Sequence, residues 1–159
     1  MTIDLRLQEL GLVLPQPPRI PPGVVLPFGW VRVCGRRALI SGHGPTNPDG
    51  SFAAPLGRVG SDVTREQAYH AARLTGLAML ASLKRELGNL DRIACWVRAF
   101  GMVNCAPGFR EMPGVINGFS DLVIEVFGQE RGQHARSAVG VAELPFDIPV
   151  EIEGEVLID

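Results

Sequence analysis

The most informative segment of this chain is His134-Ala-Arg-Ser-Ala-Val-Gly-Val-Ala-Glu143. Read as a β-strand, it places Arg136, Ala138, Gly140 and Ala142 on one face. A guanidinium followed by small side chains leaves open space beside a fixed positive charge, and a guanidinium can bind a carboxylate through two hydrogen bonds. The same pattern would also let a helix or a second subunit approach closely, with Arg136 in an ordinary salt bridge. Both interpretations stay open at this point.

The C-terminal segment, Pro149 to Ile158, also alternates. Glu151, Glu153 and Glu155 share one face of the expected strand, and apolar residues occupy the other face. Such a row is typical of the solvated face of an antiparallel sheet. Alternatively, one of these carboxylates lies across from Arg136 and acts on a proton or a water molecule. Alternation alone does not choose between these interpretations.

Outward from these strands, periodicity and turn residues predict the remaining elements. Thr64-Arg-Glu-Gln67 has the form of a capping box, and an alanine- and leucine-rich helix follows as far as Gly88. The other expected elements are a short helix within 2–11, an extended proline-rich strap at 15–22, a hairpin formed by 29–34 and 37–41, a strand at 91–103, a helix at 114–127 and strands at 135–143 and 149–158. This order predicts an α+β domain with two helices on one sheet face. We expect one domain, 24–159, preceded by an N-terminal extension, 1–23.

Composition excludes several classes of protein. With 159 residues, 46% hydrophobic and 20% charged, the chain has globular composition. A net charge of −2 disfavours a nucleic-acid binder, which needs an excess of clustered Lys and Arg. No apolar run approaches the roughly 20 residues of a membrane-spanning helix. Three cysteines without CxxC spacing, and no signal peptide at Met1, predict reduced thiols in the cytoplasm.

Common catalytic motifs are missing from the sequence. There is no P-loop, no GxSxG and no HExxH, and Gly42-His-Gly44 is too short for a dinucleotide fingerprint. The three histidines, His43, His70 and His134, lie far apart in the chain and lack ligand spacing. We therefore expect no metal site.

At the C-terminal block the sequence resembles a known family. Ala135 to Pro145, followed by Val150-Glu-Ile-Glu153, resembles the C-terminal signature of the RidA/YjgF family of reactive-intermediate deaminases. Leu39-Ile-Ser-Gly42 is similar to an early strand end of that family, and Val115-Ile-Asn117 is similar to a step on one of its helices. The fifteen residues between Arg136 and Glu151 also agree with the family spacing. The similarity extends over roughly 24–156.

This resemblance implies a chorismate-mutase-like α+β fold, with a mixed, mostly antiparallel sheet, assembled as a homotrimer with clefts between neighbouring subunits. It implies hydrolysis of small 2-imino or enamine acids, such as 2-aminoacrylate, to 2-keto acids and ammonia without cofactor or metal. By the same resemblance, Arg136 would bind the substrate carboxylate and Glu151 would position or activate water. The pocket would be lined by Phe28, Gly42, His43, Asn117 and Ala138.

The chain differs from the best-known deaminases at three of these positions. Ala138 stands in place of a cysteine, Phe28 in place of a tyrosine, and His43 in place of a glutamine. The long N-terminal region resembles that of a branch often described as putative endoribonuclease. Two alternatives to imine hydrolysis therefore stay open: a non-catalytic trimer that binds small carboxylates, and an endoribonuclease, which the acidic balance and the absence of a His pair disfavour.

Overall fold

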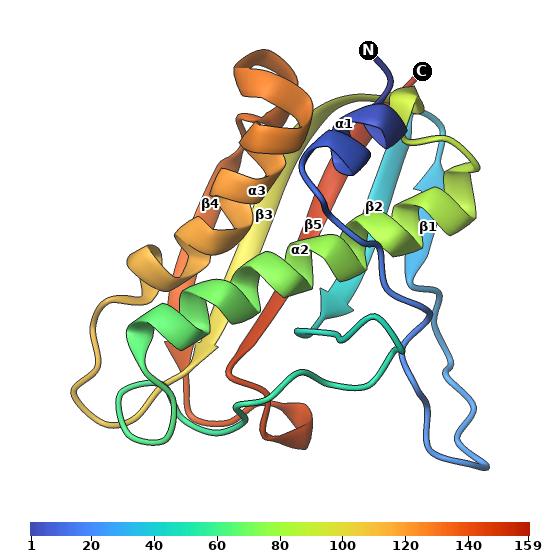
Figure 1. The fold of residues 1–159 in the computed structure, drawn as a ribbon. Helices are drawn as coiled ribbons and strands as arrows, with labels where there is room; N and C mark the ends of the chain where they lie inside the picture. Colours follow the sequence, from blue (N-terminus) through green and yellow to red (C-terminus); the bar gives the residue numbers. More distant parts are fainter.

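A five-stranded sheet forms one layer of this computed structural model, which describes residues 1–159, and helices form the other layer (Figure 1). In chain order the elements are α1 (Ile3–Glu9), β1 (Val31–Cys34), β2 (Arg37–His43), α2 (Arg65–Leu87), a 3₁₀ turn (Leu90–Arg92), β3 (Ile93–Asn104), α3 (Met112–Gly132), β4 (Ala135–Val141), a second 3₁₀ turn (Pro145–Asp147) and β5 (Val150–Ile158). The predicted order of strands and helices is confirmed.

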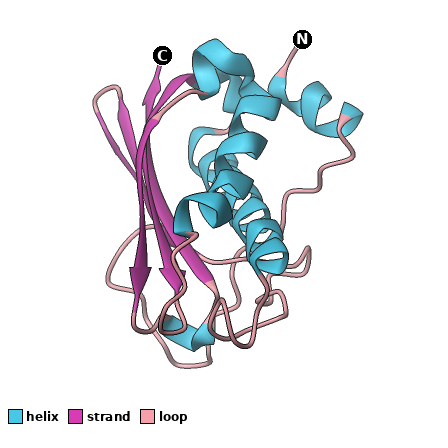
Figure 2. Ribbon diagram, turned by 90° about the vertical axis from the view of Figure 1, so that its left-hand side faces the viewer, coloured by secondary structure: helices cyan, strands magenta, loops and turns pink.

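The strand order in the sheet is β1-β2-β5-β3-β4. The pair β3–β4 is parallel and the other three pairs are antiparallel, so the expected mixed, mostly antiparallel sheet is confirmed. Figure 2 shows that the helices all lie on one side of the sheet. We call the opposite side the bare face. Strands β1 and β4 form the two edges, and each pairs on one side only.

The capping box predicted at the start of α2 is present. The Thr64 hydroxyl accepts a hydrogen bond from the Gln67 amide (3.1 Å), and the Gln67 side chain accepts one from the Thr64 amide (2.9 Å). The helix ends at Gly88, whose φ of 77° is readily adopted only by glycine. The small residues along α2 permit close packing on α3, where a Cβ on Gly76 would come within 2.7 Å of Leu122.

Several predicted boundaries require correction, among them both ends of α3 and the start of β3. Helix α3 begins at Met112, two residues before the predicted Gly114, and the helical assignment continues past Gly128 to Gly132. Gly128 nevertheless breaks the regular helix, because its backbone (φ 77°, ψ 168°) is not helical and one further turn forms beyond it. Strand β3 starts at Ile93 rather than at 91, because residues 90–92 close a 3₁₀ turn capped by the Asn89 side chain.

The core lies between the sheet and the helices and contains 31 buried apolar residues. Trp96 of β3 is 2% exposed and makes edge-to-face contacts with Phe119 and Phe127 of α3, with ring centroids 5.4 and 6.2 Å apart. Removing a large aromatic side chain from such a site typically costs 3–5 kcal/mol of folding free energy. This aromatic cluster therefore fixes α3 above β3 and β4.

The N-terminal extension packs onto the same core. Ile3 and Leu7 of α1 are each 4% exposed and belong to the main apolar cluster. The Lys84 ammonium of α2 lies 2.8 Å from the Asp4 carboxylate. Beyond α1, the predicted extended strap follows the surface and bonds to a loop through the Gln16 amide to Pro48 O and the Arg19 amide to Gly50 O, both 3.0 Å. The strap thus leads the chain from α1 toward the end of β2.

Candidate functional site

Arg136 lies on the edge strand β4, on the sheet face that α3 covers. Its Nη1 donates to the Ser120 hydroxyl (3.0 Å) and its Nη2 to the Pro113 carbonyl (3.1 Å), both on α3. Its neighbour across the parallel pair is Ala99 of β3, a fully buried core residue, which places Arg136 on the helix side of the sheet. The guanidinium is half-buried and is held at the open edge of the molecule.

Two other predicted site residues lie near this guanidinium. Asn117 is exposed and falls between Pro113 and Ser120 at intervals of four and three residues, so the three share one stripe of α3. Ala138 follows Arg136 on the same face of β4 and is paired with Gly101. We call Arg136, Asn117, Ser120 and Ala138 the Arg136 edge. Ala138 is half-buried and packs against the apolar core.

Ser120 connects Arg136 to a histidine that sequence reasoning left without a role. The Ser120 hydroxyl lies 3.0 Å from His134 Nε2, and His134 Nδ1 lies 2.7 Å from the Gly132 carbonyl. Because the carbonyl must accept, Nδ1 carries the proton and Ser120 donates to Nε2 while it accepts from Arg136. Burial, followed by the charge of Arg136, lowers the pKa of His134. A neutral imidazole and a hydroxyl thus orient the guanidinium.

Glu151 lies on β5 and points to the bare face. Its strand neighbours Val150 and Ile152 are fully buried under the helices, so the alternating residue faces the other way. The carboxylate lies against Gly42 of β2, where any Cβ would collide with it. Burial raises the pKa of Glu151, and the nearby Glu153 carboxylate raises it further. The group is therefore better able to hold a proton than an ordinary surface glutamate.

A pocket of about 280 Å³ opens beside Glu151. We call it the Glu151 pocket, and it is lined by Pro18, Leu26, Phe28, Trp30, Gly42, His43, Gly44, Thr46, Phe52, Pro145, Phe146, Ile148 and Glu151. Phe28 is 51% exposed, and its ring meets Trp30 edge-on at 5.6 Å between centroids. Three of the predicted residues, Phe28, Gly42 and His43, thus lie around the same pocket as Glu151.

His43 contributes a wall of this pocket but no free ring nitrogen. Its Nδ1 lies 2.6 Å from the Ser41 carbonyl and its Nε2 lies 2.8 Å from the Ser82 hydroxyl of α2. Burial lowers the pKa of His43 to about 4, and the Arg85 charge acts in the same direction, so the ring is neutral at pH 7. The imidazole therefore fastens the end of β2 to α2.

The predicted residues fall into two groups that one chain does not bring together. Arg136 faces the helix side of β4, Glu151 faces the bare side of β5, and β3 lies between these strands. The idea that a glutamate of the last strand lies across from Arg136 therefore does not hold within a single chain. The first group contains a half-buried cation, and the second contains a carboxylate with a raised pKa beside an apolar pocket.

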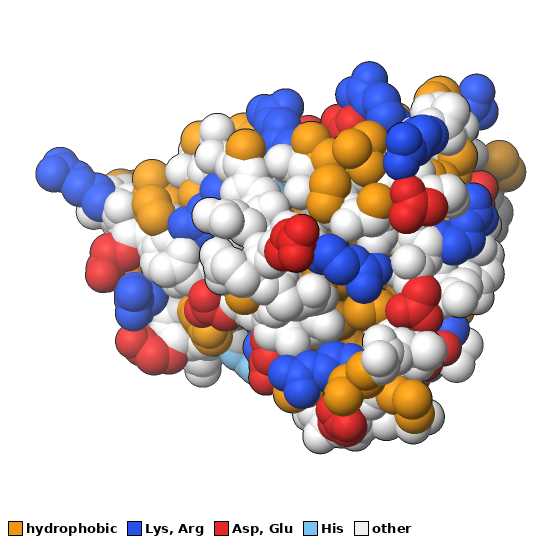
Figure 3. Space-filling model, turned by 90° about the horizontal axis from the view of Figure 1, so that it is seen from above, with side chains coloured by type: hydrophobic (Ala, Val, Ile, Leu, Met, Phe, Trp, Pro, Cys, Tyr) orange, Lys and Arg blue, Asp and Glu red, His pale blue; other side chains and the backbone are white.

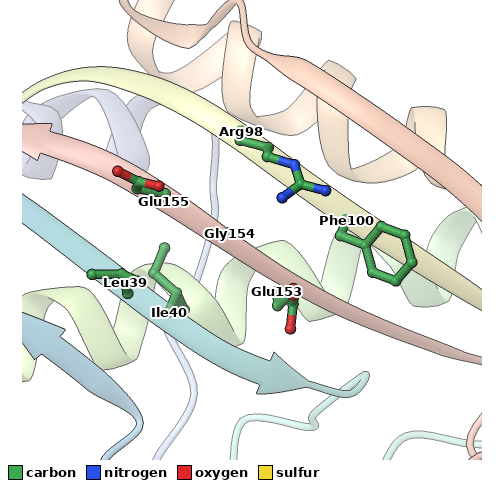
Figure 4. A pocket seen from close by; sticks show the side chains of 7 residues that line it. All are labelled: Leu39, Ile40, Arg98, Phe100, Glu153, Gly154 and Glu155. Carbon is green, nitrogen blue, oxygen red and sulfur yellow. The ribbon is translucent and has the colours of Figure 1, made fainter.

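Farther along the bare face, Glu155 has a different environment. Its carboxylate receives hydrogen bonds from Arg37, one of them 3.0 Å from Nη2, and these bonds lower the pKa of Glu155. Figure 4 shows Arg98 and Phe100 of β3 with Glu153 and Glu155 of β5 around a shallow cavity of about 170 Å³ on this face. The charged row is thus a partly solvated sheet surface, as the alternation indicates.

The structure contains no candidate metal site and no disulfide. No group of three or more His, Cys, Asp or Glu side chains is placed to hold a metal ion. The three cysteines are unpaired. None of the helices is long and apolar enough to cross a membrane. On the face seen from above in Figure 3, basic and acidic side chains are interspersed and do not form a broad basic surface.

Several residues of these two groups were not found from sequence. Ser120, His134 and the Pro113 carbonyl around Arg136 depend on the way α3 lies over β4. Three aromatic residues line the Glu151 pocket from different segments: Trp30 directly precedes β1, Phe52 lies in the loop after β2, and Phe146 lies in the second 3₁₀ turn. The available signal was the concentration of aromatic residues in segments rich in Gly and Pro.

Comparison with known proteins places the chain among related sequences. The profile of the family described as YjgF/chorismate mutase-like, putative endoribonuclease, matches residues 23–149. Protein TCP17 of Trypanosoma cruzi is 38% identical over 156 residues, which cover 97% of this chain and 92% of that protein. Among solved structures, protein Atu1372 of unknown function from Agrobacterium tumefaciens has a TM-score of 0.86 and 38% identity, covering 99% of this chain and 92% of that one. A putative endoribonuclease from Shewanella oneidensis has a TM-score of 0.89 and 29% identity, covering 99% and 100%.

Proposed function

Because the chain belongs to the YjgF/chorismate mutase-like, putative endoribonuclease family, we propose that it hydrolyses small 2-imino acids to 2-keto acids and ammonia. The observation that carries this proposal is the pair of half-sites. Arg136 is a fixed, half-buried cation beside small side chains, and Glu151 is a carboxylate with a raised pKa beside an apolar pocket. Together they supply the charge neutralisation and the proton transfer that imine hydrolysis requires.

In the proposed reaction Arg136 binds the substrate carboxylate through two hydrogen bonds. Glu151 accepts a proton from water as the water oxygen bonds to the electrophilic imine carbon, and the C=N double bond becomes a single bond to nitrogen. Glu151 then returns the proton to that nitrogen. A second proton then passes from the new hydroxyl group, through Glu151, to the amino nitrogen, and as the C–N bond breaks the hydroxyl oxygen becomes the keto oxygen and ammonia leaves. Water supplies all added atoms and the reaction is redox-neutral, so it needs no oxidant or reductant.

We further propose that the active unit is a homotrimer in which the Arg136 edge of one subunit faces the Glu151 pocket of the next. The position of Arg136 on an open strand edge and the position of Glu151 on the opposite sheet face support this arrangement. The small residue Ala138 would let the neighbouring subunit approach the guanidinium. In this arrangement the two interpretations of the β4 alternation are both true: Arg136 binds a carboxylate, and the small residues let a second subunit approach closely.

The first experiment measures keto-acid release from 2-aminoacrylate generated in situ, with wild type and Arg136→Ala. We expect wild-type turnover above the spontaneous rate and loss of that turnover in the variant. Ser137→Ala is a matched control, because Ser137 is exposed on the other face of β4. Equal rates for wild type and Arg136→Ala would contradict the assignment.

A mixing experiment tests the shared site. Arg136→Ala and Glu151→Gln subunits are each expected to be inactive, and subunits unfolded and refolded together should regain activity. In a closed ring with random mixing, about one quarter of the clefts would pair an intact Arg136 with an intact Glu151. Absence of any recovery in mixed trimers would exclude a site shared between subunits.

A second function, binding of a small carboxylate without turnover, is favoured by one observation. Phe28 lacks the hydroxyl group of the tyrosine that the best-known deaminases have, so one potential hydrogen-bond donor to the substrate is absent. This function predicts saturable binding of a keto acid in calorimetry with no ammonia release. Ribonuclease activity is tested in the same samples, and RNA cleavage that disappears in Arg136→Ala would support that function instead.

A further inference from the structure

The walls of the Glu151 pocket are mostly apolar and aromatic. Phe52 and Phe146 lie with ring centroids 5.2 Å apart, and Trp30 lies 5.0 Å from the His43 ring. The ionisable side chains in the lining are Glu151 and His43, and His43 is neutral with both nitrogens engaged. Within this chain, a substrate that enters the pocket therefore meets Glu151 as the proton-transfer group and mostly apolar surface around it.

Phe146 is held in an unusual conformation at this pocket. Its φ of 57° lies in the left-handed region, which large side chains rarely adopt, and its side chain is 62% exposed. The flanking turn is fixed by a hydrogen bond from the Gly57 amide to the Asp147 carbonyl (2.7 Å). Such conformations occur preferentially at functional sites, where surrounding structure maintains them. Here the turn keeps an aromatic ring at the mouth of the pocket.

The N-terminal segment provides the opposing wall. Pro18 of the strap lines the pocket together with Leu26 and Phe28, and Arg19 fastens the strap, because its guanidinium lies 2.9 Å from the Asp49 carboxylate. Leu26 and Phe28 thus add apolar surface to a pocket whose base is formed by β2 and β5. The segment from Pro18 of the extension to Phe28 of the domain therefore shapes the part of the site where the substrate side chain would lie.

The size of the pocket is large for the simplest imino acids. The side chain of 2-aminoacrylate is a single methylene group, which would cover only a small part of the apolar walls that enclose about 280 Å³ in the single chain. A branched aliphatic or aromatic side chain would displace water from these walls and bury its own surface against the rings. Given the proposed function, we infer that the preferred substrates are 2-imino acids with large apolar side chains, such as those derived from leucine or phenylalanine.

The test compares imino acids that an amino-acid oxidase generates from L-leucine, L-phenylalanine and L-alanine, with catalase present. The measured quantity is kcat/KM for keto-acid formation above spontaneous hydrolysis. Because one methylene in an apolar pocket changes kcat/KM roughly 10-fold or more, we expect at least about 100-fold preference for the leucine-derived over the alanine-derived substrate. Equal values for the three substrates would overturn the inference and leave the proposed function intact.

Variants locate the preference. Phe146→Ala and Phe28→Ala should each reduce the ratio of leucine- to alanine-derived kcat/KM by about 10-fold, because each removes one apolar wall. Leu5→Ala is the matched control, since Leu5 is 53% exposed on α1 and does not line the pocket. An unchanged ratio in both phenylalanine variants would contradict the role of this pocket in selecting the side chain.

A binding measurement separates the two proposals if no imino acid is turned over. Calorimetry with 4-methyl-2-oxopentanoate and pyruvate, which share the 2-keto acid group, then decides. Binding of the larger acid at least about 10-fold more tightly would support the apolar pocket while imine hydrolysis fails. Equal binding, or no binding by either acid, would overturn the inference.

Discussion

Glu151 and Glu155 share a strand and a sheet face, yet the two ends of β5 give them opposite properties. At the Glu155 end, Arg37 bonds to the carboxylate and lowers its pKa. At the Glu151 end, Gly42 leaves room for the carboxylate, and burial with a neighbouring negative charge raises its pKa. Strand β2 makes much of this difference, because it places Arg37 beside one carboxylate and Gly42 beside the other. A row of identical side chains thus contains one structural glutamate and one candidate for proton transfer.

The largest expected difference between these ends is catalytic. Glu151→Gln should lower kcat/KM for the best imino acid by about 10² to 10⁴-fold, because it removes the group that moves protons. Glu155→Gln, the matched control, should leave kcat/KM within about 2-fold, because no step uses that carboxylate. Similar losses in both variants would remove the distinction between the two ends.

The second difference concerns acid stability at the Glu151 end, where His43 fastens β2 to α2. Its pKa of about 4 in the fold lies below its ordinary value of 6.5. Stability is therefore fully present above pH 6.5 and is lost as the pH falls toward 4, by about 3 kcal/mol in total. Urea unfolding of wild type and His43→Gln at pH 7 and pH 4.5 checks this. A pH-dependent loss of equal size in both proteins would contradict it.

Steric crowding at Gly42 should weaken the Glu151 end alone. In Gly42→Ala the new methyl group must displace the Glu151 carboxylate. We expect about a 10-fold lower kcat/KM, because misplacement of a catalytic group by about 1 Å is costly. Thermal unfolding of the variant serves as the control for an intact fold, and unchanged kinetics would show that Glu151 can move without consequence.

The smallest expected effect is the difference between the pKa values of Glu151 and Glu155, which an NMR titration of the two carboxylates measures. The pKa of Glu151 should lie above 4.5 and that of Glu155 below it. Arg37→Ala should raise the pKa of Glu155, because its hydrogen-bond donor is lost, and leave that of Glu151 unchanged. Movement of both values in this variant would indicate that the two ends are electrostatically coupled.

The element order was predictable because strong local signals mark it. The capping box at Thr64 and the glycine at 88 bound α2, and alternation bounds β4 and β5. The last turn of α3 was missed because Gly128 breaks the pattern before the chain resumes a helical path. Local periodicity cannot predict this last turn, because the turn depends on the packing of Gly132 against the backbone of Val123 and Ile124.

The candidate site was predictable only in part. Sequence spacing and resemblance selected Arg136 and Glu151, but the sheet face on which each lies depends on the pairing register. Arg136 is paired with the buried Ala99, whereas Glu151 alternates with buried neighbours on β5, so the two residues fall on opposite sides of the sheet, and β3 separates their strands. The aromatic lining has a similar cause, since Phe52 and Phe146 lie far apart in the chain and meet through loop geometry. Alternation predicts which side chains share a face of a strand, but it does not predict which loops come together in space.

The two tryptophans of the chain lie in different regions, one in the core and one in the Glu151 pocket. Trp96 lies in the core beneath α3 at 2% exposure, whereas Trp30 lines the Glu151 pocket. A fluorescence signal from Trp30 should respond when the pocket fills, while Trp96 should report loss of the core on unfolding. In Trp96→Phe, the remaining emission would come from the pocket alone, so the natural sequence already contains an optical sensor of ligand occupancy.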